Sequence, residues 1–142
     1  MFGTTKQQLE VIKRFRSLLS TDSSSTINKV IGAGLVPKLV EFLKHDDIDL
    51  QYQAICAFIN ITAESSLQTK SVIDAGALPV LVELLSSQSE NVQENAVSCL
   101  GNIAGNGPEF RDLTLDHAVL SPLLKYVNKF DDIYAIINIF FD

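Results

Sequence analysis

The chain has 142 residues, enough for one domain, and its hydrophobic content of 46% is ordinary for a globular protein with a continuous core. Its formal net charge of −6 argues against a nucleic-acid binder, since such proteins carry a basic patch, and it suits a basic partner. Two cysteines, Cys56 and Cys99, are too few for a disulfide framework and predict reduced thiols inside a cell.

Neither a signal segment nor an apolar stretch of about 18 residues is visible, so we expect no membrane association. Apolar residues at helical spacing predict a first helix over residues 6–19. The polar run over 20–26 is expected to end it, and a short helix is expected over 27–31.

A turn at Gly32-Ala33-Gly34 follows the short helix. Pro37 then opens a helix that reaches about residue 44, because proline lacks the N–H that a first helical turn leaves unbonded. A longer apolar helix over 50–62 completes the unit.

The same order then returns at a fixed spacing. Ala33-Gly34-Leu35-Val36-Pro37 recurs as Ala75-Gly76-Ala77-Leu78-Pro79 (75 − 33 = 42), and Asn60-Ile61 recurs as Asn102-Ile103 (102 − 60 = 42). We expect helices over 69–74, 79–85 and 92–104. A capping box at Ser87 and Glu90 is expected before the last of them, with Gly105 as its stop. A third round is expected from His117 and fades after Phe130.

A fixed spacing of this size predicts a solenoid of stacked helical units, since armadillo and HEAT repeats have periods of about 40–47 residues. The three-helix unit favours armadillo. The predicted fold is an all-α, right-handed superhelical armadillo solenoid of about three repeats, in a single domain over 1–142. Its repeats are expected at about 5–45, 46–87 and 88–129, with a partial terminal helix over 130–142. Residues expected to face inward on the long helices are Ala54, Ala57, Phe58, Ile61, Ala96, Val97, Leu100, Ile103 and Ala104.

Asn60 and Asn102 are the candidate binding residues. Each lies four residues after another position outside the core, Cys56 or Ser98, and residues i and i+4 share a helix face. An Asn amide offers two donors and an acceptor, so a column of them can clamp the backbone of an extended peptide. The alternative is that both amides satisfy neighbouring backbone near a helix end.

Six strings in the chain resemble the importin-α (karyopherin-α) family over roughly residues 6–127, the family's first repeats. They are Ala33-Gly34-Leu35-Val36-Pro37, Gln68-Thr69-Lys70, Ala75-Gly76-Ala77-Leu78-Pro79, Ala96-Val97, Leu100-Gly101-Asn102-Ile103-Ala104-Gly105 and Phe110-Arg111-Asp112-Leu113. The resemblance implies a divergent or truncated member.

Importin-α is an armadillo adaptor for basic nuclear localisation signals, so the resemblance implies nuclear protein import, in cytoplasm and nucleus. Its Trp-x-x-x-Asn pattern clamps the signal backbone with asparagines and forms lysine slots with tryptophans. The peptide-binding residues implied here are Asn60, Asn102, Cys56, Ser98, Thr69, Asn95, Asn106, Tyr134 and Asn138.

The departures from the family pattern predict weakened affinity. The chain contains no Trp, and Cys56 and Ser98 stand at the family's Trp positions. Asn106 stands where an acidic residue is expected, and Ala63-Glu64 replaces a Ser-Gly turn. A cation over an aromatic ring contributes about 0.5–2 kcal/mol, so losing several slots is expected to weaken binding by a few decades.

The end of the chain leaves two interpretations open. Tyr134-x-x-x-Asn138 is either a shortened third copy of the binding helix or a chance pairing on an apolar helix. Phe140-Phe141-Asp142 is apolar and uncapped, which suggests self-association. The alternative function is therefore a non-catalytic scaffold or regulatory paralogue. No importin-β-binding segment is visible, so we expect no independent transport by importin-β.

Other patterns are weaker. His45, Asp46, Asp47 and Asp49 resemble a metal site but are more typical of a solvated charge run, and the glycines at 101, 105 and 107 follow no strand. The basic helix with Lys13, Arg14 and Arg16 is too small for nucleic acid. We find no catalytic constellation, and we predict no enzyme, no cofactor and no metal.

Overall fold

The computed structural model describes residues 3–21, 23–63 and 65–130, and all regular structure in these ranges is helical. The helices are α1 (Thr5–Thr21), α2 (Ser23–Gly32), α3 (Val36–Leu43), α4 (Ile48–Thr62), α5 (Ser66–Asp74), α6 (Ala77–Leu84), α7 (Glu90–Gly105), α8 (Pro108–Asp116) and α9 (Leu120–Phe130). The all-α prediction is confirmed.

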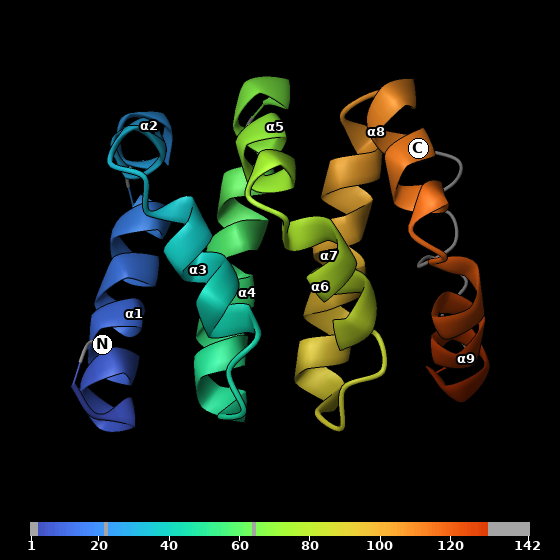
Figure 1. The fold of residues 1–142 in the computed structure, drawn as a ribbon, viewed down its shortest axis with the longest axis horizontal. Helices are drawn as coiled ribbons and strands as arrows, with labels where there is room; N and C mark the ends of the chain where they lie inside the picture. Colours follow the sequence, from blue (N-terminus) through green and yellow to red (C-terminus); the bar gives the residue numbers. More distant parts are fainter. Residues whose placement is uncertain (1–2, 22, 64, 131–142) are drawn as a thin grey trace.

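The helices stack as a short solenoid (Figure 1). The long helices α1, α4 and α7 stand side by side, and α4 contacts both of its neighbours. Helix α3 packs on α4, α6 packs on α7, and α2, α5 and α8 form a row at the upper edge. Each unit therefore covers its apolar face with the next unit, as a repeat protein requires.

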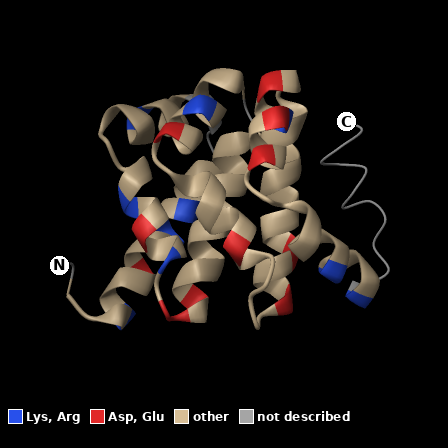
Figure 2. Cartoon of the chain, turned by 45° about the vertical axis from the view of Figure 1, so that its right-hand side comes forward, with Lys and Arg blue, Asp and Glu red and all other residues tan. Residues whose placement is uncertain are grey.

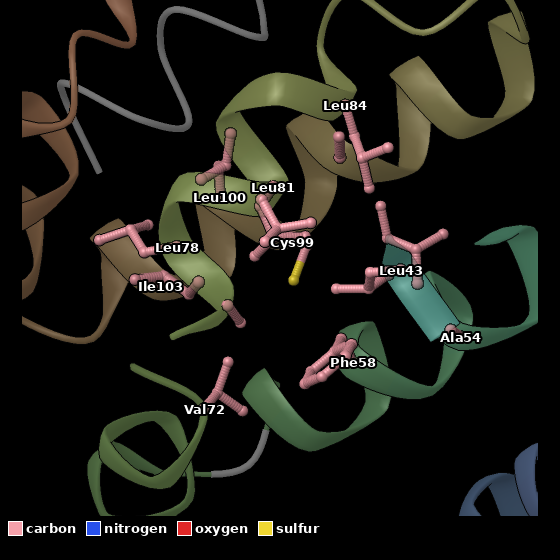
Figure 3. Close-up of a cluster of buried hydrophobic side chains, with 14 of the residues drawn as sticks. Leu43, Ala54, Phe58, Val72, Leu78, Leu81, Leu84, Cys99, Leu100 and Ile103 are labelled. Carbon is pink, nitrogen blue, oxygen red and sulfur yellow. The ribbon is translucent and has the colours of Figure 1, made fainter. Parts of the chain in front are cut away.

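A continuous apolar core runs between the units, and every inward residue predicted on the long helices is buried in it. Figure 3 shows Phe58 of α4 and Cys99, Leu100 and Ile103 of α7 converging with Leu81 of α6. Burial raises the pKa of the Cys99 thiol from an ordinary 9.0 to about 12, opposed by its contact with Thr62. Cys99 is thus a core residue.

The tight turns also keep the repeat period. The backbone has positive φ at Gly34 (73°), Gly76 (83°) and Ala118 (56°), and these positions are evenly spaced (76 − 34 = 42 and 118 − 76 = 42). Glycine adopts this left-handed conformation without steric cost, whereas an alanine is strained there. The third unit therefore repeats the turn with a less suitable residue.

Three local predictions need correction. The polar run over 20–26 ends α1 at Thr21, as expected, but α2 begins at Ser23, four residues before the expected start at Ile27; serines are tolerated in a first helical turn, where N–H groups are free. The third round begins with α8 at Pro108, one repeat period after the start of α5 (108 − 66 = 42), and not at His117.

The third difference concerns the cap of α7. Ser89 is the residue that caps this helix, and its side chain accepts from the Val92 N–H at 3.3 Å. Ser87 accepts from the Ser89 N–H at 3.1 Å. Helix α7 also includes Gly105, so its C-terminal cap is Asn106.

Candidate functional site

The predicted binding residues lie on neighbouring faces of α4 and α7. Cys56 and Asn60 lie on α4, Ser98 and Asn102 lie at the corresponding places on α7, and the two helices pack directly against each other. The common register follows from the repeat, because each pair is separated by one repeat period. Cys56, Asn60 and Asn102 are half-buried, and Ser98 is exposed.

The amide of Asn102 bonds the preceding unit. Its Nδ2 donates to the carbonyl oxygen of Ile59 and to Oγ1 of Thr62, both at 3.3 Å. The alternative interpretation of this residue, as a partner for neighbouring backbone, is therefore observed. These contacts use the Nδ2 donors, and Oδ1 makes no hydrogen bond to the described residues, so it is the atom that stays available to a ligand.

Asn60 has a different environment, although it occupies the same place in its repeat. It is half-buried and lines a cavity between α1 and α4. Within residues 3–21, 23–63 and 65–130, its side chain makes no hydrogen bond. With respect to the described residues, the whole amide, two donors and an acceptor, is thus available to a ligand.

Asn106, which is half-buried, and Thr69 form a brace at the end of α7. The Asn106 Nδ2 lies 2.7 Å from the Asn102 carbonyl oxygen, 3.0 Å from Thr69 Oγ1 and 3.3 Å from the Thr62 carbonyl oxygen. Thr69 is fully buried, and its Oγ1 also lies 3.5 Å from the Thr62 carbonyl oxygen. These two predicted peptide-binding residues therefore join α4, α5 and α7.

Cys56 and Asn95 meet between α4 and α7, where Asn95 Nδ2 lies 3.5 Å from Cys56 Sγ. Burial raises the pKa of the Cys56 thiol, and the Arg16 charge and a hydrogen bond with Tyr52 partly oppose that rise. Cys56 is therefore a neutral thiol in the wall of the groove at neutral pH. Ser98 Oγ donates to the Glu94 carbonyl oxygen of its own helix at 3.2 Å.

The cavity beside Asn60 has a volume of about 580 Å³ and is walled by α1 and α4. Lys13 and Arg16 of α1 reach it, together with Gln53, Cys56 and Asn60 of α4. Arg16 Nη1 donates to Gln53 Oε1 at 2.9 Å, and the guanidinium lies 5.6 Å from the centre of the Tyr52 ring. The charged side chains that line this cavity, among the described residues, are thus basic.

Sequence reasoning did not single out Arg16 and Gln53, which line the cavity, or Glu94. Glu94 is exposed and lies four residues before Ser98, so the i, i+4 rule extends the column Glu94, Ser98 and Asn102. This spacing could have indicated Glu94 from the sequence alone. The pairing of Arg16 with Gln53 joins two different helices across the stack, and the repeat gives no signal for it. Tyr134 and Asn138 lie outside the described residues.

The acidic loop before α4 has a local structural role. Asp47 Oδ1 accepts from the Leu50 N–H at 3.0 Å and caps α4, while His45 Nδ1 accepts from the Asp47 N–H at 3.0 Å.

In the part of the chain that the structure describes, no group of His, Cys, Asp and Glu is arranged to hold a metal. Lys and Arg are mixed with Asp and Glu over the ribbon (Figure 2).

The repeat architecture matches a known family. The sequence model of the Armadillo/beta-catenin-like repeat matches residues 26–63 and 65–105, that is, the sets α2–α4 and α5–α7. The chain belongs to the armadillo-repeat family. Armadillo repeats are non-catalytic binding units, so membership supports the prediction that these repeats catalyse no reaction.

The relatives confirm the importin-α-like character of this armadillo chain. It is 52% identical to importin subunit alpha-3 of Caenorhabditis elegans and 49% identical to importin subunit alpha-2 of Arabidopsis thaliana, in each case over 86% of this chain. It covers 24% and 23% of those proteins, so it spans about a quarter of their length.

Solved structures agree with the fold. A designed armadillo repeat protein, YIII(Dq)4CqI, superposes with a TM-score of 0.85 at 30% identity, over 96% of this chain and 56% of that chain. Another, solved in complex with the peptide (KR)4, superposes with a TM-score of 0.81 at 29% identity, over 94% of this chain and 59% of that chain. None of the described helices has the length and apolar character that crossing a membrane requires.

Proposed function

We propose that this armadillo chain binds an extended peptide along the groove formed by α4 and α7. The observation that carries the proposal is the Asn60 and Asn102 register, in which a whole amide and an amide oxygen stay available on adjacent units. Asn60 would bond both a carbonyl and an N–H of the peptide backbone, and Asn102 Oδ1 would accept from a peptide N–H.

The peptide we propose is basic, of the nuclear-localisation-signal kind, and the setting is nuclear import between cytoplasm and nucleus. The importin-α relatives and a (KR)4 peptide on a designed neighbour support this class. In the groove itself, the exposed carboxylate of Glu94, one turn before Ser98, supplies the attraction for Lys or Arg.

The affinity is proposed to be weaker than in a groove with aromatic slots. Cys56 and Ser98 present a neutral thiol and a hydroxyl where an aromatic face would hold a cation. Asn106 Nδ2 donates to oxygen atoms of Thr62, Thr69 and Asn102, and the side chain carries no negative charge that would attract a lysine. Each missing cation–π contact costs about 0.5–2 kcal/mol.

Fluorescence anisotropy with a labelled lysine-rich peptide tests the proposal. The double variant Asn60→Ala with Asn102→Ala is expected to bind at least about 10-fold more weakly, since three backbone hydrogen bonds of about 0.5–1.5 kcal/mol each are lost. Asn128→Ala, an exposed asparagine on α9, is the matched control and is expected to leave the affinity unchanged. No binding, or equal loss in the control, refutes the groove.

A second candidate function is a scaffold that self-associates. Leu120 (54% exposed) and Leu124 (49% exposed) lie four residues apart and form an outward apolar stripe on α9. The residues 140–142 that first suggested self-association lie outside the described part of the chain. Light scattering at micromolar concentration tests this candidate: a dimer that Leu120→Gln with Leu124→Gln dissociates supports it, and a monomer counts against it.

A further inference from the structure

The cavity between α1 and α4 has the opposite charge to the chain as a whole. The chain carries a formal net charge of −6, yet the charged side chains that line this cavity are Lys13 and Arg16, and none of the described acidic residues lines it. We call the site formed by Lys13, Arg16, Gln53 and Asn60 the basic pocket. A lysine of a bound peptide would be repelled there.

Arg16 is held in place for binding. Arg16 is half-buried, and its guanidinium donates to Gln53 Oε1 at 2.9 Å and lies over the Tyr52 ring, 5.6 Å from its centre. A guanidinium has five N–H donors, and this hydrogen bond uses one of them. Because the planar guanidinium of Arg16 is already oriented, little side-chain entropy is lost when a carboxylate binds to it.

Two further groups complete the pocket. Asn60 lines the same cavity, and its amide is available for the reasons given above. Lys13 lies on α1 one turn before Arg16, is exposed to solvent and adds a second positive charge at the rim. Two cations and an amide donor around one cavity match the acceptor-only oxygens of a carboxylate.

We propose that the basic pocket binds a carboxylate of the extended peptide, either an acidic side chain or a free chain terminus. The inference rests on the proposed function, because Asn60 belongs to both sites. A ligand would then place basic residues near Glu94 on α7 and an acidic group between α1 and α4. The groove would reject a peptide with a basic residue at the pocket, which adds specificity through repulsion.

The geometry sets the spacing between the two charges of the ligand. The axes of packed helices lie about 8–10 Å apart. Because the basic pocket lies between α1 and α4, about one and a half of these interhelical distances separate it from the outer face of α7. An extended chain advances about 3.3 Å per residue. The acidic group is therefore expected about three to five residues from the basic segment.

The test uses the full chain and lysine-rich peptides that carry Glu or Gln three, four or five residues from the basic segment, in both orders along the peptide, with amidated ends. A further peptide has Gln and a free C-terminal carboxylate, which separates a terminus from a side chain as the ligand. At low salt we expect one Glu peptide, or the free-terminus peptide, to bind about 3- to 10-fold tighter than its neutral counterpart.

Three variants decide where any preference arises. Lys13→Gln and Arg16→Gln are expected to reduce it to less than about 2-fold. Arg14→Gln removes the same charge from an adjacent exposed position outside the pocket, and it is expected to keep the preference. Lys13→Gln is the decisive variant, because Arg16→Gln also breaks the bond to Gln53.

The outcomes separate this inference from the proposed function. If charged and neutral peptides bind equally well, the basic pocket is overturned. If their binding is also lost in the double variant Asn60→Ala with Asn102→Ala, the proposed groove still stands. Equal loss of preference in Arg14→Gln and Lys13→Gln also overturns the pocket, because it shows a general effect of charge. No binding of any lysine-rich peptide overturns the groove itself, and the pocket with it.

Discussion

At the scale of single residues, the repeated asparagines Asn60 and Asn102 occupy the same place in two units but have different environments. Asn102 ties α7 to the end of α4 with its two N–H groups, and Asn106 continues the same network to Thr69. Asn60 holds the equivalent position in the preceding unit, but its amide faces the cavity beside α1. The identical sequence pattern thus yields one braced and one available amide.

Replacing Asn106 by aspartate tests the brace. The carboxylate cannot donate to the carbonyl oxygens of Thr62 and Asn102, so we expect Asn106→Asp to lower the free energy of unfolding by about 1–2 kcal/mol. The added charge is expected to tighten binding of a lysine-rich peptide severalfold. Urea denaturation and anisotropy measure the two effects, with Asn128→Asp as the exposed control; unchanged stability would refute the brace.

The buried thiol of Cys99 makes stability depend on pH at alkaline values. Its pKa is raised from 9.0 to about 12 in the folded chain, so between these values the unfolded chain loses the proton and the folded chain keeps it. Stability from this group is fully present below pH 9 and is lost as pH rises toward 12, by up to about 1.4 kcal/mol per pH unit.

Comparison with Cys99→Ala isolates this contribution, because other groups titrate in the same range. Urea denaturation at pH 8, 9 and 10 is expected to show a steeper loss of stability in the natural chain than in the variant. Parallel pH profiles would contradict a buried neutral thiol.

At the scale of elements, the same turn precedes α3, α6 and α9, and its last copy is strained. Ala118 has φ 56° where the earlier units have Gly34 and Gly76. We expect Ala118→Gly to raise the free energy of unfolding by about 0.5–1 kcal/mol, since glycine relieves the left-handed strain at some entropic cost.

Ala75→Gly is the matched control for that prediction. Ala75 lies in the corresponding turn with φ −78°, a conformation that alanine adopts freely, so glycine is expected to destabilise there. Thermal denaturation measures both variants. A destabilising Ala118→Gly would show that the turn is not strained.

Most of the helical units could be predicted from the sequence, because the apolar spacing and the Pro37 and Pro79 starts both recur at the repeat period. The residue that caps α7 could not be predicted from the sequence. Ser87 and Ser89 both accept a hydrogen bond from a backbone N–H, and only the structure shows which of them caps the helix. The basic pocket was also out of reach, because Arg16 and Gln53 meet across two helices and α1 has no earlier copy to compare.

At the scale of the whole molecule, the charged side chains differ along the proposed groove. Lys13 and Arg16 lie at the α1 end, and Glu94 lies on α7. The asparagines proposed to bind the peptide backbone lie on α4 and α7. The extended peptide that we propose would therefore meet both a backbone clamp and a charge gradient, which together would fix its orientation.

The side-chain amide signals of the asparagines in a 15N–1H NMR titration with a lysine-rich peptide test the groove most directly. We predict that the Asn60 and Asn102 signals shift progressively and saturate together, while the Asn128 signal stays in place. Binding that leaves the Asn60 and Asn102 signals unmoved, or that shifts Asn128 as much, would contradict the groove.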